Sequence, residues 1–432
     1  MTAEVTIKDG TRLAAHSLRA AVLGEVHARP FTPLLSPRRL LHFAFATAGE
    51  AAKADRAAFA EFCARRGLDP LREDAKQHRV VDGAIVLRWE QHSEFTTYTW
   101  ELSATGLPFH PPAATLAAPM ADLPQPGPLL VALDLHLIKD AGAAFERLLD
   151  PASLAVADTR DGDALFATDF QPDAAGFVRI VVLDRGMTPE RAGALVQRLI
   201  EIETYRTLAL LGLPEAQRLS PSINRIESRL ADVTEEMRST ERLVDNHRLL
   251  DELTALAAEL EAGAAASLFR FGASRAYNEI VQTRLATIGE KPVEGFTTWS
   301  AFLARRMQPA MRTCVTTEER QADLSQKLAR AANLLRTRVD VELEQQNRSL
   351  LQSMNARTRL QLRLQTTVEG LSVAAISYYV VGLFGHVVEG AHAEGLGVNV
   401  RLATALFVPV AVVAIWLLVR RIRRRHMAGK DQ

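Results

Sequence analysis

The stretch GLSVAAISYYVVGLFGHVV, residues 370–388, runs for 19 positions without a formally charged side chain. A second stretch, LATALFVPVAVVAIWLLV at residues 402–419, does the same for 18 positions. A helix needs about 20 mostly apolar residues to cross the hydrocarbon core of a bilayer. Either stretch alone could be a buried core helix of a soluble domain. Because only the 13 residues 389–401 separate the two, we expect a transmembrane hairpin over residues 369–419.

The charged flanks of this hairpin predict its orientation. Five arginines follow the second stretch within residues 420–425, and three precede the first within residues 357–363. The connector holds one basic residue, Arg401. Because basic residues are retained on the cytoplasmic side, we expect both termini in the cytoplasm, with residues 420–432 as a basic tail. Residues 1–25 contain no long apolar run, so no signal peptide is expected.

Residues 216–368 are expected to form a helical, coiled-coil-like stalk. Apolar residues recur at steps of three and four from Ile223 to Met237, as in a helix with one buried stripe. Pro221 suits the first turn of that helix, and we expect its end near Gly263. Residues 310–369 contain neither proline nor glycine, so a second helix is expected over residues 316–388, with a break near 347–355 as the alternative. Such a long polar helix needs a partner along its side, either the first helix or copies in other subunits, and we expect the two helices of one chain to pack antiparallel.

The preceding part, residues 1–215, is expected to be a cytoplasmic α+β domain with its own core. Helical composition marks residues 48–66 and 189–211. Strand composition marks residues 84–100 (one long strand or a hairpin), 129–138, 164–170 and 177–183. Residues 107–128 hold seven prolines and are expected to form a loop.

Composition and motifs exclude several classes of function. The 432 residues hold 51 basic and 51 acidic side chains, which gives no general electrostatic reason to bind nucleic acid. Two distant cysteines, Cys63 and Cys314, exclude a disulfide framework. The sequence contains no phosphate-binding loop, no nucleophile elbow, no H-E-x-x-H motif and no dinucleotide fingerprint. We therefore regard enzymatic activity as uncertain, with a non-enzymatic role favoured.

Three small groups of residues are candidates for a site. Glu25, His27 and Arg29 alternate in one segment, and Glu90, His92 and Glu94 alternate in another. Alternation in a strand would place each group on one face, where an anion or a divalent metal ion could bind. A salt-bridged, solvated strand face is the alternative for both. Ser377 and His386, inside the first apolar stretch, are candidates for lining a pore.

Three segments together resemble a known family. They are GEVHARP at residues 24–30, RWEQHSEFTTY at residues 88–98, and residues 333–368. They resemble the bacterial domain-of-unknown-function family 3422 (DUF3422), which implies a membrane-anchored bacterial protein without an established activity. The architecture also resembles, more loosely, that of CorA-type magnesium channels. Their Gly-Met-Asn signature is missing here, because residues 382–390 read GLFGHVVEG.

We therefore expect a multi-pass protein of the bacterial inner (cytoplasmic) membrane that acts as a self-associating structural, interaction or sensory module. Its expected partners are the lipid bilayer and further copies of itself, and no nucleic acid. No cofactor is predicted, and a divalent metal is the one that the residue types would suit. The alternative is an oligomeric CorA-like ion channel or transporter without the selectivity motif.

Overall fold

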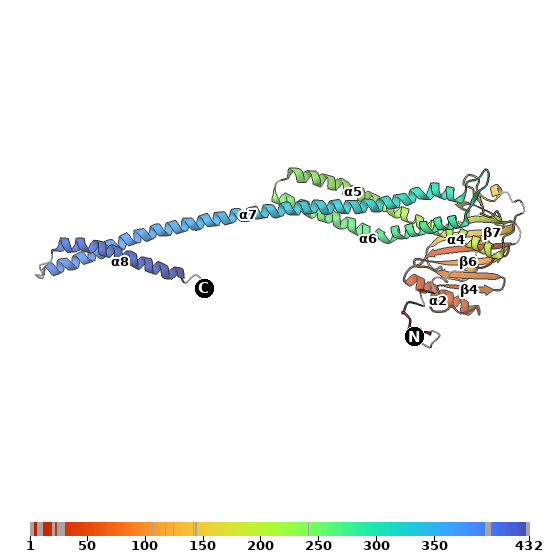
Figure 1. Cartoon of the computed structure of the whole chain (residues 1–432), viewed down its shortest axis with the longest axis horizontal. Coiled ribbons are helices and arrows are strands. Elements are labelled where there is room, and N and C mark those ends of the chain that lie inside the picture. Colours follow the sequence, from red (N-terminus) through yellow and green to blue (C-terminus); the bar gives the residue numbers. More distant parts are fainter. Residues whose placement is uncertain are drawn as a thin grey trace. The chain divides into compact units, whose positions relative to one another are not determined.

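The structure is a computed structural model that describes residues 4–6, 12–19, 22–23, 31–104, 107–116, 118–123, 125–140, 142, 145–240, 242–393 and 399–428. The chain divides into two compact units. The first comprises Met1–Arg238 and Asp251–Ala332, and the second comprises Ser239–Leu250 and Asn333–Gln432. Figure 1 shows the ribbon of the whole chain.

The first unit is built on a nine-stranded sheet of order β11-β8-β9-β10-β7-β3-β6-β5-β4. Strands β7 and β10 are parallel, and the other neighbours are antiparallel. The strands are β3 (Arg38–Ala46), β4 (Gln77–Asp82), β5 (Ile85–Gln91), β6 (Phe95–Ser103), β7 (Leu129–Lys139), β8 (Ala155–Asp158), β9 (Ala164–Pro172), β10 (Val178–Asp184) and β11 (Lys291–Pro292). A separate antiparallel pair joins β1 (Glu4–Thr6) to β2 (Arg12–Ala14).

The strand predictions are confirmed where β-branched and aromatic residues dominate. Residues 84–100 form the hairpin of β5 and β6, and the other three predicted strands correspond to β7, β9 and β10. Strand β3 was not predicted, although it lies between β6 and β7 near the middle of the sheet. Its sequence RRLLHFAFA is buried over seven consecutive residues, so it carries no alternating signal.

Helices cover both faces of the sheet. Helix α2 (Glu50–Arg65) packs with the aromatic cluster that contains Phe59, Trp89 and Tyr98. Helix α4 (Pro189–Leu210) packs on the opposite face, and Thr188 caps it by accepting a hydrogen bond from the backbone N–H of Arg191. Both helices were predicted. Short helical segments occur in the connections: α3 (Ala113–Leu116), η1 (Ala118–Asp122) and η2 (Phe145–Arg147).

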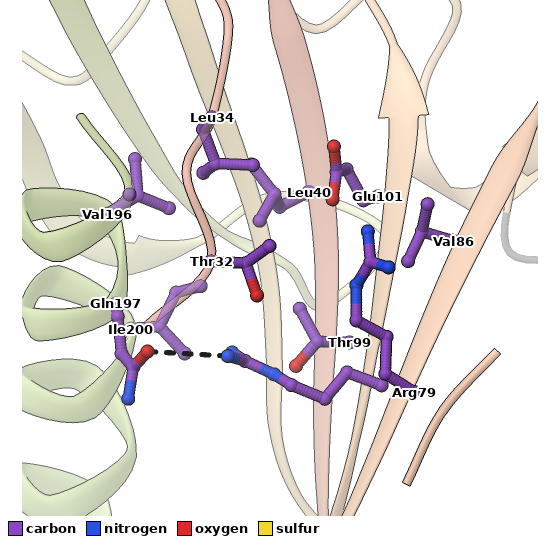
Figure 2. Close-up of a pocket in the computed structure, with 12 residues that line it drawn as sticks. Thr32, Leu34, Leu40, Arg79, Val86, Thr99, Glu101, Val196, Gln197 and Ile200 are labelled. Carbon is purple, nitrogen blue, oxygen red and sulfur yellow. Dashed lines mark hydrogen bonds between the residues drawn. The ribbon is translucent and has the colours of Figure 1, made fainter. Parts of the chain in front are cut away.

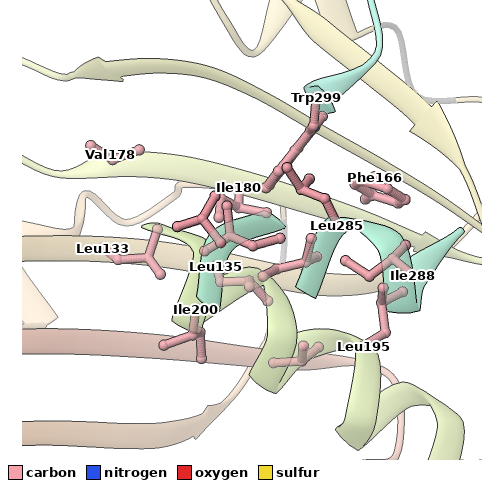
Figure 3. Close-up of a cluster of buried hydrophobic side chains, with 14 of the residues drawn as sticks. Leu133, Leu135, Phe166, Val178, Ile180, Leu195, Ile200, Leu285, Ile288 and Trp299 are labelled. Carbon is pink, nitrogen blue, oxygen red and sulfur yellow. The ribbon is translucent and has the colours of Figure 1, made fainter. Parts of the chain in front are cut away.

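The core beneath α4 includes residues from much later in the chain. Leu285, Ile288 and Trp299 pack with strand residues such as Ile180 and Phe166 (Figure 3). The Trp299 and Phe166 rings meet edge to face at 5.2 Å, and the indole N–H donates to the Ala155 carbonyl. Strand β11 also comes from this later region. Residues 1–215 therefore do not complete the core on their own.

Four long helices follow: α5 (Gly212–Ser239), α6 (Leu243–Ile288), α7 (Trp299–Ala393) and α8 (Val400–Ala428). Two predicted boundaries are wrong. Pro221 lies inside α5, whose first turn begins nine residues earlier, and Gly263 lies inside α6. The chain leaves the helical conformation between Ser239 and Leu243 instead. Helix α7 is continuous through residues 347–355, as the absence of proline and glycine predicted.

The expected antiparallel packing against the long helix α7 is found for α6, where Arg275 pairs with Glu318 and Ser325 donates to Glu261, and it is wrong for α5. In the first unit, α6 runs antiparallel to α5, because Arg225 pairs with Glu259 and Arg229 with Glu252. Helix α5 runs parallel to α7, with the N-terminal Gly212 near Cys314 and Glu227 bonded to Arg320. The extra reversal at residue 240 turns one predicted helix into two, so α5 and α7 share a direction.

The second unit contains the later part of α7 and all of α8. The Phe384 and Phe407 rings stack at 3.8 Å between the two helices. By length and composition, both helices are apolar enough to cross a membrane. Only 11% of each apolar window is buried inside the structure. Most of the apolar side chains in these windows therefore have no protein cover from the described part of this chain.

Candidate functional site

The two predicted ligand groups have different outcomes. Glu25, His27 and Arg29 lie outside the described residues. Glu90 lies on β5, whereas His92 and Glu94 lie in the turn between β5 and β6. The strand ends at Gln91, so the expected alternation does not continue through the group.

Glu90, His92 and Glu94 each contact different neighbours. Glu94 forms an ion pair with Arg270 at 2.5 Å, and the His92 ring stacks on Phe95 at 4.0 Å. Glu90 accepts a hydrogen bond from Thr97 at 3.5 Å. Within the described part of the chain, no three or more His, Cys, Asp or Glu residues are placed to hold a metal ion. The metal site stays a prediction, because the 24–30 segment is not described.

Glu90 and His92 nevertheless line a polar cleft between the sheet and α4, which we call the α4 cleft. It consists of two cavities of about 30 Å³ each, and Arg88 lines both of them. Figure 2 shows the first of them. Its lining includes Thr32, Arg79, Arg88, Thr99, Glu101 and Gln197, and that of the second includes His42, Arg88, Glu90, His92, Gln197, Glu201 and Thr204. A cavity of this volume holds about one water molecule.

Arg88 joins the two cavities through its guanidinium group. One terminal nitrogen donates to the side-chain oxygen of Gln197 at 3.3 Å, and Gln197 donates to Glu201 at 3.0 Å. Glu201 pairs in turn with Arg284 of α6. The Arg88 Nε lies 3.7 Å from a Glu90 oxygen and makes no hydrogen bond within the described residues. This network holds sheet, α4 and α6 together and leaves one buried donor for an ordered water or a small anion.

His42 lines the second cavity and has both ring nitrogens occupied. Thr204 donates its own hydroxyl proton to the Ile200 carbonyl, so it accepts from His42 Nε2 at 3.1 Å. His42 Nδ1 then accepts from the Thr99 hydroxyl at 2.8 Å. Burial lowers the pKa of His42 to about 3, and Arg88 and His92 contribute to this lowering. A neutral ring with no free nitrogen cannot bind a metal or relay a proton, so His42 positions α4 against the sheet.

This arrangement predicts an acid-sensitive stability. The unfolded chain binds a proton at His42 below about pH 6.5, whereas the folded chain stays neutral there down to about pH 3. The contribution of neutral His42 to the free energy of unfolding is therefore fully present above about pH 6.5. It falls by about 1.4 kcal/mol per pH unit as the pH decreases from about 6.5 to about 3. Glutamine does not titrate, and its amide offers a donor to Thr204 and an acceptor to Thr99. Between pH 7 and pH 5 we therefore expect the unfolding free energy of His42→Gln to fall by about 2 kcal/mol less than that of the native protein. Urea unfolding at both pH values measures this, and identical losses would contradict it.

The opposite face of the sheet carries a buried ionic group that the sequence analysis missed. Arg39 of β3 makes two hydrogen bonds to Asp134 of β7, at 2.9 and 2.6 Å. His136 lies 3.4 Å from the same carboxylate and accepts from the backbone N–H of Phe109. All three side chains are at most 4% exposed. The signal was present, because Asp134 and His136 alternate within a strand, LLVALDLHLIK, whose other residues are apolar up to Ile138.

The two candidate pore residues lie in different surroundings in the second unit. Ser377 is buried, and its hydroxyl has no hydrogen-bond partner in the described part of the chain. The His386 side chain is 82% exposed and lies 3.6 Å from Glu389. They are not brought together at one point of the helix.

These features define a class of protein: a mixed α/β sheet domain, followed by long helices, with two helices apolar enough to enter a membrane. A family model described as a protein of unknown function, DUF3422, matches residues 14–426. The chain belongs to this family over nearly its whole length, as the sequence resemblance indicated. No curated protein matches the chain, and nothing supports the looser likeness to CorA-type channels.

Proposed function

We propose that this protein is an inner-membrane protein whose sheet domain and helices are held at the cytoplasmic face by a transmembrane hairpin of α7 and α8. One observation carries the proposal: the apolar side chains of both helices are uncovered. Leu371, Leu383, Leu406 and Val413 are 55–67% exposed. In water this apolar surface would promote aggregation, whereas the hydrocarbon core of a bilayer accommodates it. Extraction with alkaline carbonate tests the anchor, and release of the full chain into the supernatant would contradict it.

The arginine flanks support cytoplasmic termini. We expect a single cysteine placed at the carboxyl end to be protected from a membrane-impermeant maleimide in intact cells, because the flanking arginines resist translocation. A single cysteine in the connector, at Glu394→Cys, serves as the matched positive control and should be labelled. Labelling of the carboxyl end before cell lysis would contradict this topology.

The activity we propose is self-association rather than catalysis. The α4 cleft supports this choice, because its polar groups bond mainly to one another and His42 has no free nitrogen. Light scattering of the detergent-solubilised chain tests the proposal, since a monomer at micromolar concentration would contradict it. Binding of a divalent metal through His27 or His92 stays a further proposal, tested by calorimetry against the double alanine variant.

A further inference from the structure

Helix α7 has an uncovered apolar stripe that precedes its apolar window in the sequence. Six residues form it, and we call them the exposed α7 stripe: Leu343, Leu350, Met354, Leu360, Leu364 and Val368. Their exposed fractions lie between 40% and 67%. At 100° per residue they fall within about a third of the helix circumference. The charged residues Glu344, Arg348, Arg359 and Arg363 fall on the opposite side.

The stripe continues a face that the chain covers elsewhere. Val339 and Leu335, one and two turns before Leu343 on the same face, are at most 4% exposed. In the second unit, the start of α6 covers this part of α7, where Asn246 donates to Glu342 at 3.0 Å and Arg338 donates to the Thr240 carbonyl at 3.2 Å. Beyond residue 342, the described part of the second unit places no further helix beside α7 until α8. The same apolar face therefore passes from covered to uncovered at one place in the helix.

We infer that a second copy of this chain covers the exposed α7 stripe, with the two α7 helices parallel and in register. This inference rests on the proposed self-association and adds its surface and geometry. Five of the six stripe residues belong to a coiled-coil seam that alternates steps of four and three over four heptads, and Leu360 flanks it. The seam positions are 343, 347, 350, 354, 357, 361, 364, 368 and 371. Anchoring in one bilayer holds neighbouring copies parallel and raises their effective concentration.

The polar members of the seam favour a copy of the same chain over another partner. Asn347 and Gln361 occupy equivalent seam positions, and their amides have both donors and acceptors. Each can bond to its own counterpart only in a parallel, in-register pair, whereas an antiparallel or shifted pair would bury unpaired amides against leucine. A single asparagine in such a position sets register and oligomeric state. Arg357, the only charged seam residue, occupies a central position of the seam, and its long side chain can carry the guanidinium past the apolar contact to solvent.

Disulfide cross-linking of the full-length chain in its own membrane tests the geometry. The two native cysteines are buried and are first replaced by alanine. Single variants Leu350→Cys and Leu364→Cys then report on the stripe, and Arg348→Cys and Arg359→Cys are matched controls on the opposite face. After oxidation with copper phenanthroline, we expect disulfide-linked dimers of the stripe variants at least about tenfold above the controls. Because these side chains are exposed in one chain, the substitutions leave its fold intact.

Each outcome decides one proposal. Equal cross-linking on both faces, or none, overturns the exposed α7 stripe as an interface. Efficient linkage of Leu343→Cys to Val368→Cys on co-expression overturns the parallel register. Carbonate extraction of the same samples separates this result from the anchor, because a soluble chain still reports its cross-linking pattern. As a second measurement, the double variant Leu350→Asp/Leu364→Asp should reduce the detergent-solubilised assembly to monomers while remaining in the membrane fraction.

Discussion

Replacing Asp134 by alanine is expected to lower the free energy of unfolding by about 3–5 kcal/mol. The Arg39 and Asp134 side chains are 3% and 2% exposed, and their two hydrogen bonds form a forked ion pair. The substitution leaves the Arg39 guanidinium inside the sheet domain, where it still donates to the Pro111 carbonyl but has lost its counter-ion. A buried charge without its counter-ion is among the costliest single changes in a folded protein.

The double variant Arg39→Met/Asp134→Leu separates the cost of an orphaned charge from the value of the pair. Apolar side chains of similar size often replace a buried ion pair at little cost, so we expect the double variant to be more stable than Asp134→Ala. Asp74→Ala, at an exposed position, is the control and should change stability by less than about 0.5 kcal/mol. Tryptophan fluorescence during urea unfolding measures all three in a Trp416→Phe background. Its remaining tryptophans, Trp89, Trp100 and Trp299, are buried in the sheet domain. Equal stability of Asp134→Ala and Asp74→Ala would contradict the argument.

The sequence predicted those elements whose local pattern agrees with their final environment. Strand β7 and helix α4 are strongly patterned and were found within one or two residues. Strand β3 was not predicted, because it is buried on both faces of the sheet and its sequence therefore does not alternate between apolar and polar residues. The expected domain of residues 1–215 leaves out a part of the core that comes from later in the chain. Trp299 donates a hydrogen bond to Ala155 of β8, which lies 144 residues earlier. Such contacts depend on topology, which periodicity does not encode.

The candidate site was predictable only in part. Glu90 and His92 were selected for their ligand types, and both line the α4 cleft. Other side chains that line this cleft come from β3 and α4, which lie far away in sequence, so neither His42 nor Gln197 could be joined to them beforehand. The ion pair of Glu94 with Arg270 shows the same difficulty. A carboxylate in a strand-like pattern carries no sign of whether a cation from a distant helix will neutralise it.

The helical bundle of the first unit gives a second large effect, at Leu230 of α5. Leu230 is 8% exposed, between the fully buried Ile226 and Val233 on the same helix face. Leu230→Asp would place a carboxylate in this seam without a partner. We expect a loss of more than about 4 kcal/mol, because the variant forfeits apolar burial and also desolvates a charge.

A suitable control is Ser228→Asp, two residues earlier on the exposed side of α5. The adjacent Arg229 would mislead, because it pairs with Glu252 and Glu236 and its loss would disturb α6. We expect Ser228→Asp to lie within about 0.5 kcal/mol of the native protein. If thermal unfolding of Leu230→Asp and Ser228→Asp is the same, α5 does not pack through this face. In that case the packing of the bundle would depend on α6 and α7 alone, and the ion pairs of Arg225 and Arg229 with α6 would be surface contacts without an apolar seam beneath them.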